Sequence, residues 1–305
     1  MTFRFELGDE NSPRPNSTSH SSSQSLKEVI VFAPNDRDNP HNWSNRKKSF
    51  VVFNGVALVM SSTIGSSIAA GASHQFAAYF DITNQAQLVL PTSSYLIGYV
   101  LGPLLFGPLS ESYGRKWVMI STFALFTAFT LGCALANDFA TLCVLRLFMG
   151  IGASSPISVV GGIYADVYPD PVARGRALTI FMTATTFGPI LGPITSGFIA
   201  VVSWRWIFWL SLIIAGVTWP ILLFSPETYA PIILAMRARR LRKENGNPNI
   251  FAPIELEHHD LKQMIIVVLT RPVRMFFTEA IVLCSCLYLS FVYAIFYMYF
   301  QAYPT

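Results

Sequence analysis

The chain has 305 residues, of which 52% are hydrophobic and 12% are charged, and its formal net charge is +4. Soluble globular proteins carry about 25% charged residues, so this composition excludes an ordinary soluble protein and predicts a polytopic membrane protein. The basic residues cluster between apolar runs, which argues for a lipid bilayer as partner and against nucleic acid.

Residues 1–45 are polar and rich in serine, asparagine, aspartate and proline. They carry too little apolar surface to fold, so we expect a disordered tail. Glycosylation sequons begin at Asn16 and Asn42, and they matter only if the tail faces the lumen.

Seven apolar runs follow, each long enough to cross a hydrocarbon core of ~30 Å as a helix. The predicted helices are 49–70, 88–109, 117–136, 141–164, 176–201, 206–224 and 276–300. The sequence therefore predicts an all-α membrane protein with a six-helix domain over residues 46–225. A central loop (226–273) and a seventh helix (within 274–305) follow it.

The distribution of Lys and Arg predicts the topology. With a cytoplasmic N-terminus, all of them except Arg146 and Arg205 fall in the tail and in the loops after the second, fourth and sixth helices. The positive-inside rule therefore places the N-terminus in the cytoplasm, where both sequons stay unused.

An internal repeat relates the first three helices to the next three. Leu-Gly-Pro occurs twice, and Gly98, Gly107 and Arg115 recur 90 residues later as Gly188, Gly197 and Arg205. A unit of three helices is inverted relative to the next, which predicts the three-plus-three inverted repeat found within one half of a transporter.

The link between the second and third helices runs from Gly107 to Lys116. Gly107 allows two helices to approach closely, and Gly114 permits the positive φ of a tight turn. Arg115 and Lys116 hold the turn at the cytoplasmic face, and Glu111 lies at i,i+4 from Arg115, where two charges can pair. A tight turn without further function explains these residues equally well.

This Gly-x-x-x-(Asp/Glu)-x-x-Gly-Arg-Lys pattern resembles the signature loop of the major facilitator superfamily, with Glu111 at the usual aspartate. Asn-Pro-x-Asn-Trp at 39–43 resembles the start of the fungal drug:proton antiporters of that superfamily. The resemblance covers about residues 39–305. It implies a multi-pass protein of the plasma membrane, or alternatively the vacuolar membrane, that uses a proton gradient and no cofactor.

The first charge deep inside a predicted helix is Arg146. An arginine at mid-bilayer costs about 2.5–3.5 kcal/mol or more, so it is a functional hypothesis by default, with a snorkelling or structurally paired side chain as the alternative. The run from Arg146 to Gly152 resembles the helix-four motif of the superfamily, in which the arginine is implicated in proton coupling.

Asp166 ends the fourth predicted helix and precedes Arg174 and Arg176, a pattern that a solvated loop with a charge pair also explains. By resemblance, these residues join a cytoplasmic charge network that would latch the two halves of the transporter together. Its predicted members are Gly107, Glu111, Gly114, Arg115, Lys116, Asp166, Arg174, Arg176 and Glu227.

The fifth helix carries Gly188-Pro189, Gly192-Pro193 and Gly197. Interior prolines kink a helix, and glycines at i,i+4 form a flat face for close packing, so a generic kinked membrane helix is one explanation. The run also resembles the antiporter motif, which the symporters of the superfamily usually lack, although Pro193 stands where that motif usually has glycine.

Trp204-Arg205-Trp206 opens the sixth helix. We interpret it as an aromatic belt at the outer interface, and it also resembles the outer-loop motif of the superfamily.

The resemblance implies proton-coupled export of hydrophobic or cationic small molecules such as drugs, toxins or secondary metabolites. The sequence has no phosphate loop, zinc spacing or Gly-x-Ser-x-Gly, so we expect neither an enzyme nor a metal site. Members of the superfamily have twelve or more helices, so we expect a truncated chain. The alternatives are an inactive or regulatory fragment that binds a second membrane chain, and a transporter that takes up a polyamine or sugar.

Overall fold

The computed structural model describes residues 2–4, 28–256, 270 and 274–302. The long helices are α1 (Asn45–Ser67), α4 (Leu90–Tyr113), α5 (Arg115–Leu135), α6 (Phe139–Ala153), α7 (Ser155–Val167), α8 (Pro171–Ile199), α9 (Arg205–Leu223) and α13 (Ala280–Ala302). Within the described residues, seven helical segments are long and apolar enough to cross a membrane, which confirms the predicted all-α polytopic membrane protein.

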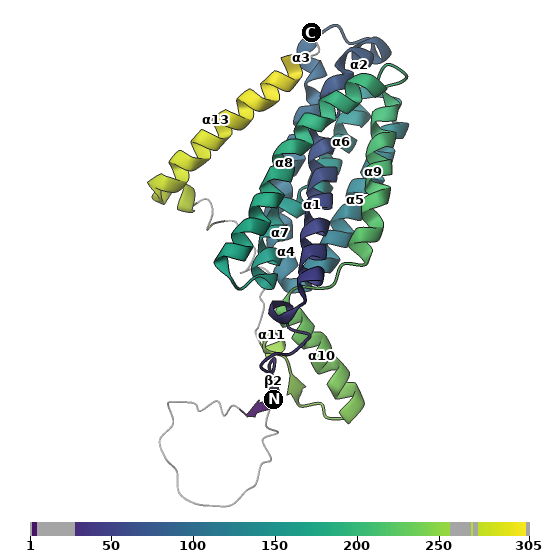
Figure 1. Ribbon diagram of the computed structural model, residues 1–305. Coiled ribbons are helices and arrows are strands. Elements are labelled where there is room, and N and C mark those ends of the chain that lie inside the picture. The colour runs from purple at the N-terminus through teal and green to yellow at the C-terminus, as the bar shows by residue number, and fades with distance from the viewer. Residues whose placement is uncertain (1, 5–27, 257–269, 271–273, 303–305) are drawn as a thin grey trace, which may run out of the picture.

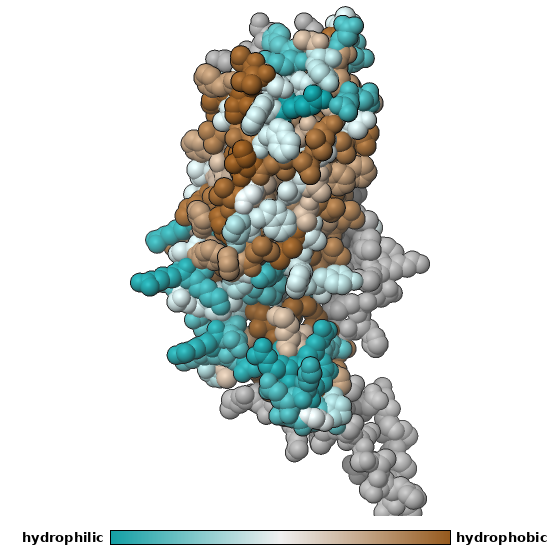
Figure 2. All heavy atoms as spheres, turned by 90° about the vertical axis from the view of Figure 1, so that its right-hand side faces the viewer, coloured by the Kyte–Doolittle hydropathy of each residue, from teal (hydrophilic) through white to brown (hydrophobic). Residues whose placement is uncertain are grey.

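The first six spans lie side by side in an elongated bundle with α1 at its centre, whereas α13 leans away diagonally along one side (Figure 1). Figure 2 shows apolar residues over the body of the bundle and hydrophilic residues gathered at its two ends. We call the end where α1 begins and α9 ends the basic end, because Arg46, Lys116 and Arg176 lie there. The opposite end, the far end, carries η2 (Ala70–Ala72), α2 (Ser73–Phe80) and α3 (Gln85–Leu88).

The fourth predicted helix is divided into α6 and α7 at Ser154. Pro156, in the first turn of α7, has no N–H to donate to the carbonyl of Gly152, so the α-helical ladder is interrupted there. The fifth helix begins earlier than predicted, at Pro171, because Asp170 caps it by accepting the N–H of Ala173 at 3.0 Å. Arg174 therefore lies in α8 and not in the loop before it, contrary to the prediction, while Arg176 lies one turn and more inside the helix that it was predicted to begin.

Two close helix contacts follow the predicted repeat. A Cβ at Gly98 of α4 would overlap the Leu147 carbonyl of α6, and a Cβ at Gly188 of α8 would overlap the Thr63 side chain of α1. Gly98 and Gly188 are related by the repeat. Each allows its helix to pack closely against a neighbour, α4 against α6 and α8 against α1.

A small clasp forms below the basic end from two distant parts of the chain. It joins β2 (Glu28–Ile30), which is parallel to β3 (Ile250–Phe251), to α10 (Ala230–Asn245) and α11 (Pro253–Leu256), and β1 (Thr2–Arg4) pairs antiparallel with β2. Its apolar core consists of Ile30, Leu234, Ala235, Ala238, Ile250 and Ala252. The apolar face of α10 is thus covered by protein.

The clasp corrects the prediction of a disordered tail for residues 28–45. These residues form β2, the short 3-10 helix η1 (Pro40–Asn42) that contains Asn42, and the start of α1. Ile30 and Phe32 pack against α10 and β3, and Trp43 packs into the core of the helix bundle, so distant residues supply the apolar partners that the local composition lacks. Asn16 and the serine-rich stretch lie outside the described residues.

Candidate functional site

Arg115 is the centre of a charge cluster at the basic end. Its side chain is only 9% exposed; Nε donates to Oδ2 of Asp166 at 3.2 Å, and Nη1 donates to Oγ of Ser110 at 2.8 Å. Glu111 lies at the predicted i,i+4 position with its Oε1 4.0 Å from Nη1, but its side chain is 62% exposed. Solvent therefore screens the Glu111 contact, and Asp166 is the principal partner.

Glu227 joins this cluster through the backbone. Its Oε1 accepts the N–H of Arg115 at 3.1 Å and its Oε2 accepts the N–H of Lys116 at 3.0 Å, which caps the first turn of α5 with a negative charge. Gly114 has φ +98°, as the sequence predicts, and a Cβ there would lie 2.7 Å from Oε2 of Glu227. Glycine is therefore required both by the turn and by the carboxylate beside it.

Three predicted members of the network, Gly107, Arg174 and Arg176, make none of these contacts, and the side chain of Lys116 binds elsewhere. A Cβ at Gly107 would meet nothing within 4 Å, so among the described residues Gly107 seats no neighbouring helix. Arg174 and Arg176 form no ion pair with any residue that the structure describes. Lys116 Nζ donates to the carbonyl of Leu223 at 3.1 Å, which ties α5 to the end of α9.

Arg146 is fully buried in the bundle. Its Nε donates to the carbonyl of Pro91 at 3.0 Å, Nη1 to Gly65 at 2.7 Å and Nη2 to Ser66 at 3.2 Å, and its guanidinium lies 4.7 Å from the centre of the Tyr95 ring. Across 2–4, 28–256 and 274–302, no carboxylate lies within 4.0 Å of it.

The partners of Arg146 explain how a buried cation is held there. Gly65 and Ser66 belong to the last turn of α1, which ends at Ser67, and the last carbonyls of a helix have no partner within it. A guanidinium at this negative end of the helix dipole satisfies them. Arginine stays protonated in proteins, so the Arg146 guanidinium keeps its positive charge and does not alternately release and take up a proton.

A row of hydroxyl groups lies beside Arg146, and sequence reasoning missed it. Ser62 Oγ lies 2.8 Å from the hydroxyl of Tyr99, and Ser66 Oγ lies 2.9 Å from the hydroxyl of Tyr297 on α13. Tyr95 donates to the carbonyl of Ser62 at 2.6 Å and stacks on Tyr99. Serines one turn apart in an apolar helix were the available signal, and their polar face points to α4 and α13.

The glycines of α8 have two different roles. A Cβ at Gly188 or Gly192 would overlap the side chain of Thr63 or Ser67 of α1, whereas a Cβ at Gly197 would meet nothing within 4 Å among the described residues. Pro189 and Pro193 lie inside the helix. Only the first two glycines therefore form the predicted close face.

The tryptophans at the far end are divided between core and surface. Trp204 is only 4% exposed and its ring contacts those of Phe76 and Phe208, so it is a core residue and the aromatic-belt prediction is wrong for it. Trp206 is exposed, as a belt residue is. Arg205 opens α9 and donates to the carbonyl of Ala136 at 3.1 Å, and it stacks on Trp204.

Comparison with known proteins gives this arrangement a family. The sequence profile of the Major Facilitator Superfamily matches residues 52–305. The multidrug transporter TPO3 of Candida glabrata is 36% identical over 87% of this chain and 42% of its own length. Polyamine transporter 3 of Saccharomyces cerevisiae is 36% identical over 87% and 43%, and a citrinin biosynthesis cluster transporter of Monascus ruber is 35% identical over 89% and 54%.

Solved structures agree on the fold. The proton:xylose symporter XylE, bound to 6-bromo-6-deoxy-D-glucose, superposes with a TM-score of 0.56 over 79% of this chain and 56% of its own, at 18% identity. The chain spans about half the length of the curated relatives that it matches. By sequence profile, identity and fold, this multi-pass membrane protein belongs to the major facilitator superfamily.

Proposed function

We propose that the chain functions in proton-coupled export of hydrophobic small molecules, such as drugs, toxins or secondary metabolites, with the proton gradient as its energy source. The observation that carries this proposal is the close packing of α8 against α1 at Gly188 and Gly192, within a run that resembles the antiporter motif. The names of relatives, which include a multidrug transporter and a biosynthesis-cluster transporter, support it.

The charges inside the spans favour a hydrophobic substrate over a cationic one. In the described spans, Arg146 is the only charged side chain away from the helix ends, and the polar groups near it are hydroxyls. A cation would meet a buried positive charge there and no carboxylate. A polyamine or a cationic drug would therefore need an acid from outside these spans.

We further propose that the basic end faces the cytoplasm. The membrane that we propose is the plasma membrane, with the vacuolar membrane as the alternative. The positive-inside rule supports this orientation, because Arg46, Arg174 and Arg176 lie at that end.

A second candidate is a regulatory membrane fragment that needs another chain. The specific observation in its favour is α13, none of whose membrane-spanning window is buried within the structure. A helix bundle contributed by a second membrane chain would cover that helix.

Transport by inside-out vesicles that contain the chain tests the proposal. A naphthalene-based neutral fluorescent probe should accumulate when an acidic interior is imposed, and a protonophore should abolish the accumulation. Equal accumulation in vesicles without the chain would reject export by this chain. Recovery of transport only with a co-expressed partner half would favour the second candidate.

A further inference from the structure

The first membrane span is a single span made of separate helical pieces. It extends over Asn45–Phe80, in which α1 ends at Ser67, η2 occupies Ala70–Ala72 and α2 begins at Ser73. A 3-10 stretch inside a longer helix is a common place for a functional hinge. No proline lies between these bounds, so the interruption is not imposed by a missing backbone N–H.

Two hydrogen bonds of a continuous helix are absent at this interruption. To continue α1, the N–H groups of Ala69 and Ala70 would donate to the carbonyls of Gly65 and Ser66. Neither bond is formed in the part of the chain that the structure describes. The same two carbonyls instead accept hydrogen bonds from Nη1 and Nη2 of Arg146, at 2.7 and 3.2 Å. The guanidinium therefore takes the place of the two backbone donors.

The charge of Arg146 favours a helix end at this place. No carboxylate that the structure describes lies within 4.0 Å of Arg146, so other groups balance its positive charge. The C-terminal end of a helix carries about half a negative elementary charge, which a continuous helix would not present there. Without that compensation the buried guanidinium would be costly, so the interruption of α1 and the buried cation stabilise each other.

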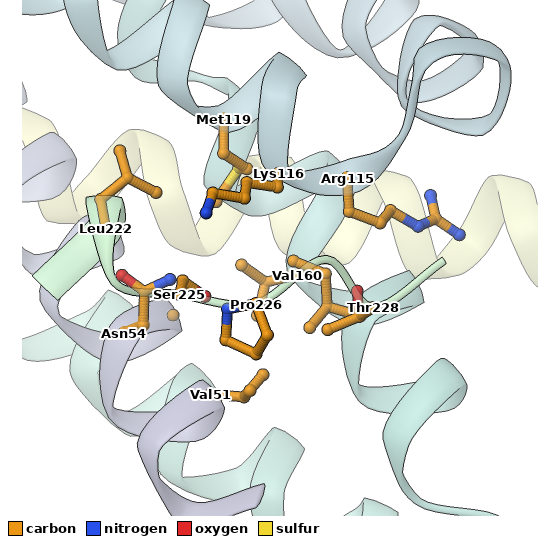
Figure 3. A pocket seen from close by; sticks show the side chains of 12 residues that line it. Val51, Asn54, Arg115, Lys116, Met119, Val160, Leu222, Ser225, Pro226 and Thr228 are labelled. Carbon is orange, nitrogen blue, oxygen red and sulfur yellow. The ribbon is translucent and has the colours of Figure 1, made fainter. Parts of the chain in front are cut away.

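Arg115 is also buried, but it is held differently. It lies beside the pocket at the basic end that Figure 3 shows, and its Nε donates to the carboxylate of Asp166 at 3.2 Å. An acid balances the charge of Arg115, whereas backbone carbonyls balance that of Arg146. Arg115 is therefore a matched control, because its loss removes a second buried guanidinium without removing a partner of Gly65 or Ser66.

The two pieces of the span pack against different neighbours. At the interruption, a Cβ at Gly71 would overlap Oγ of Ser196 and lie 2.8 Å from the carbonyl oxygen of Pro193, so η2 lies directly against α8. Beyond it, the ring of Phe76 in α2 lies 5.5 Å from the ring of Trp204, the N-cap residue of α9. The interruption thus joins two segments that are held separately, α1 in the bundle and α2 at the far end (Figure 1).

We propose that Arg146 keeps the first span divided, because its guanidinium occupies the carbonyls that Ala69 and Ala70 would otherwise bind. Without the guanidinium, α1 continues through Ala70 towards α2 as one helix. Arg146 is then a positioning residue, which sets where α1 ends and keeps α2 a separate segment. This role does not depend on the substrate or on the direction of transport.

Hydrogen exchange of the chain in lipid bilayers tests the division of the span. In Arg146→Ala, the amides of Ala69 and Ala70 gain helical partners, so we expect their exchange to slow by about tenfold relative to wild type. Arg146→Gln should act in the same direction, because it also removes the charge. Arg115→Ala should leave both amides unchanged. Unchanged exchange of these amides in both Arg146 variants would overturn the proposal.

Chemical rescue separates the role of the guanidinium from a general loss of stability. Methylguanidinium, added to Arg146→Ala well below denaturing concentrations, should bind in the vacated place, raise Tm and return the exchange of the two amides to the wild-type rate. Methylurea has a similar planar shape but no charge, so it should do neither. Rescue by methylguanidinium alone supports the proposal, also where Arg146→Ala folds only in its presence. Equal effects of both compounds, or no effect of either on the amides, would overturn it.

Discussion

Glu227 and Arg115 meet through the backbone of Arg115 and not through its side chain. The carboxylate accepts the Arg115 N–H at 3.1 Å, while the guanidinium of the same residue pairs with Asp166 at 3.2 Å. Arg115 thus binds two carboxylates, that of Glu227 at its backbone N–H and that of Asp166 at its guanidinium. This arrangement holds together the segment after α9, the start of α5 and the end of α7.

This geometry predicts unequal couplings between the charges. In double-mutant cycles of the free energy of unfolding, Arg115→Gln and Asp166→Asn should show a coupling energy above about 1 kcal/mol. Either substitution alone already removes the partly buried, charge-assisted hydrogen bond between the two side chains, so the second substitution cannot remove it again. Arg115→Gln with Glu227→Gln should be additive within about 0.5 kcal/mol, because the backbone N–H survives the first substitution. Unfolding of the chain in detergent measures both cycles, and equal couplings would contradict the arrangement.

The two kinds of glycine in α8 predict different costs of substitution. Gly192→Ala places a methyl group against Ser67 Oγ and the α1 backbone, so it should destabilise the protein by about 1–3 kcal/mol. Gly197→Ala is the matched control and should cost less than about 0.5 kcal/mol, because its Cβ would meet nothing within 4 Å in the part of the chain that the structure describes. Ser67→Ala should relieve part of the Gly192→Ala cost, and a control variant as unstable as Gly192→Ala would refute this packing.

The clasp should respond to pH through Asp36. The N–H of Asp38 and the guanidinium of Arg237 both donate to its carboxylate and lower the pKa of Asp36 below its ordinary value of 3.8. A lowered folded-state pKa means that the ionised group stabilises the clasp above the ordinary value, and that this contribution is lost as the pH falls through the folded-state pKa.

Hydrogen exchange at the amide of Glu28, which donates to the carbonyl of Asn249 at 2.8 Å, measures clasp stability. Asp36→Asn should reduce its protection at pH 7, and the difference from wild type should shrink below about pH 4. Asp38→Asn keeps the backbone donor and serves as the control. A wild-type advantage that persists undiminished at the lowest pH would contradict the role of the Asp36 charge.

Arg146 should not tolerate lysine. Lysine keeps the charge but lacks the planar fork that reaches the carbonyls of Pro91, Gly65 and Ser66 together. We expect Arg146→Lys to lose about 1–3 kcal/mol of stability, since buried carbonyls are left unsatisfied. Arg176→Lys, on an exposed side chain, is the control, and thermal unfolding compares them. Equal stability of the two variants would mean that the fork is dispensable.

Features that depend on neighbouring residues could be predicted from the sequence. The seven spans follow from the length of apolar runs, and the positive φ of Gly114 follows from the charged turn around it. Helical spacing could also have separated the glycines, because Gly197 lies nine residues after Gly188, about 180° around the helix. Gly107 has the same relation to Gly98, and among the described residues a Cβ at Gly107 or Gly197 would meet nothing within 4 Å.

Features that depend on distant residues could not be predicted. Asp36 and Arg237 are 201 residues apart, so neither the tail nor the central loop alone reveals the clasp. The same holds for Arg146, whose carbonyl partners come from α1 and α4. A backbone carbonyl leaves no mark in a sequence, so this buried arginine could be assigned a functional role but not its partners.

The most direct test of the account is the direction of transport under proton gradients of opposite sign. A single vesicle preparation containing the chain is loaded with the neutral naphthalene probe on both sides, and the sign of the pH gradient is then reversed. Antiport predicts that the probe moves against the proton flow each time, towards the more acidic compartment. Movement of the probe with the protons in both cases would contradict export and identify a symporter.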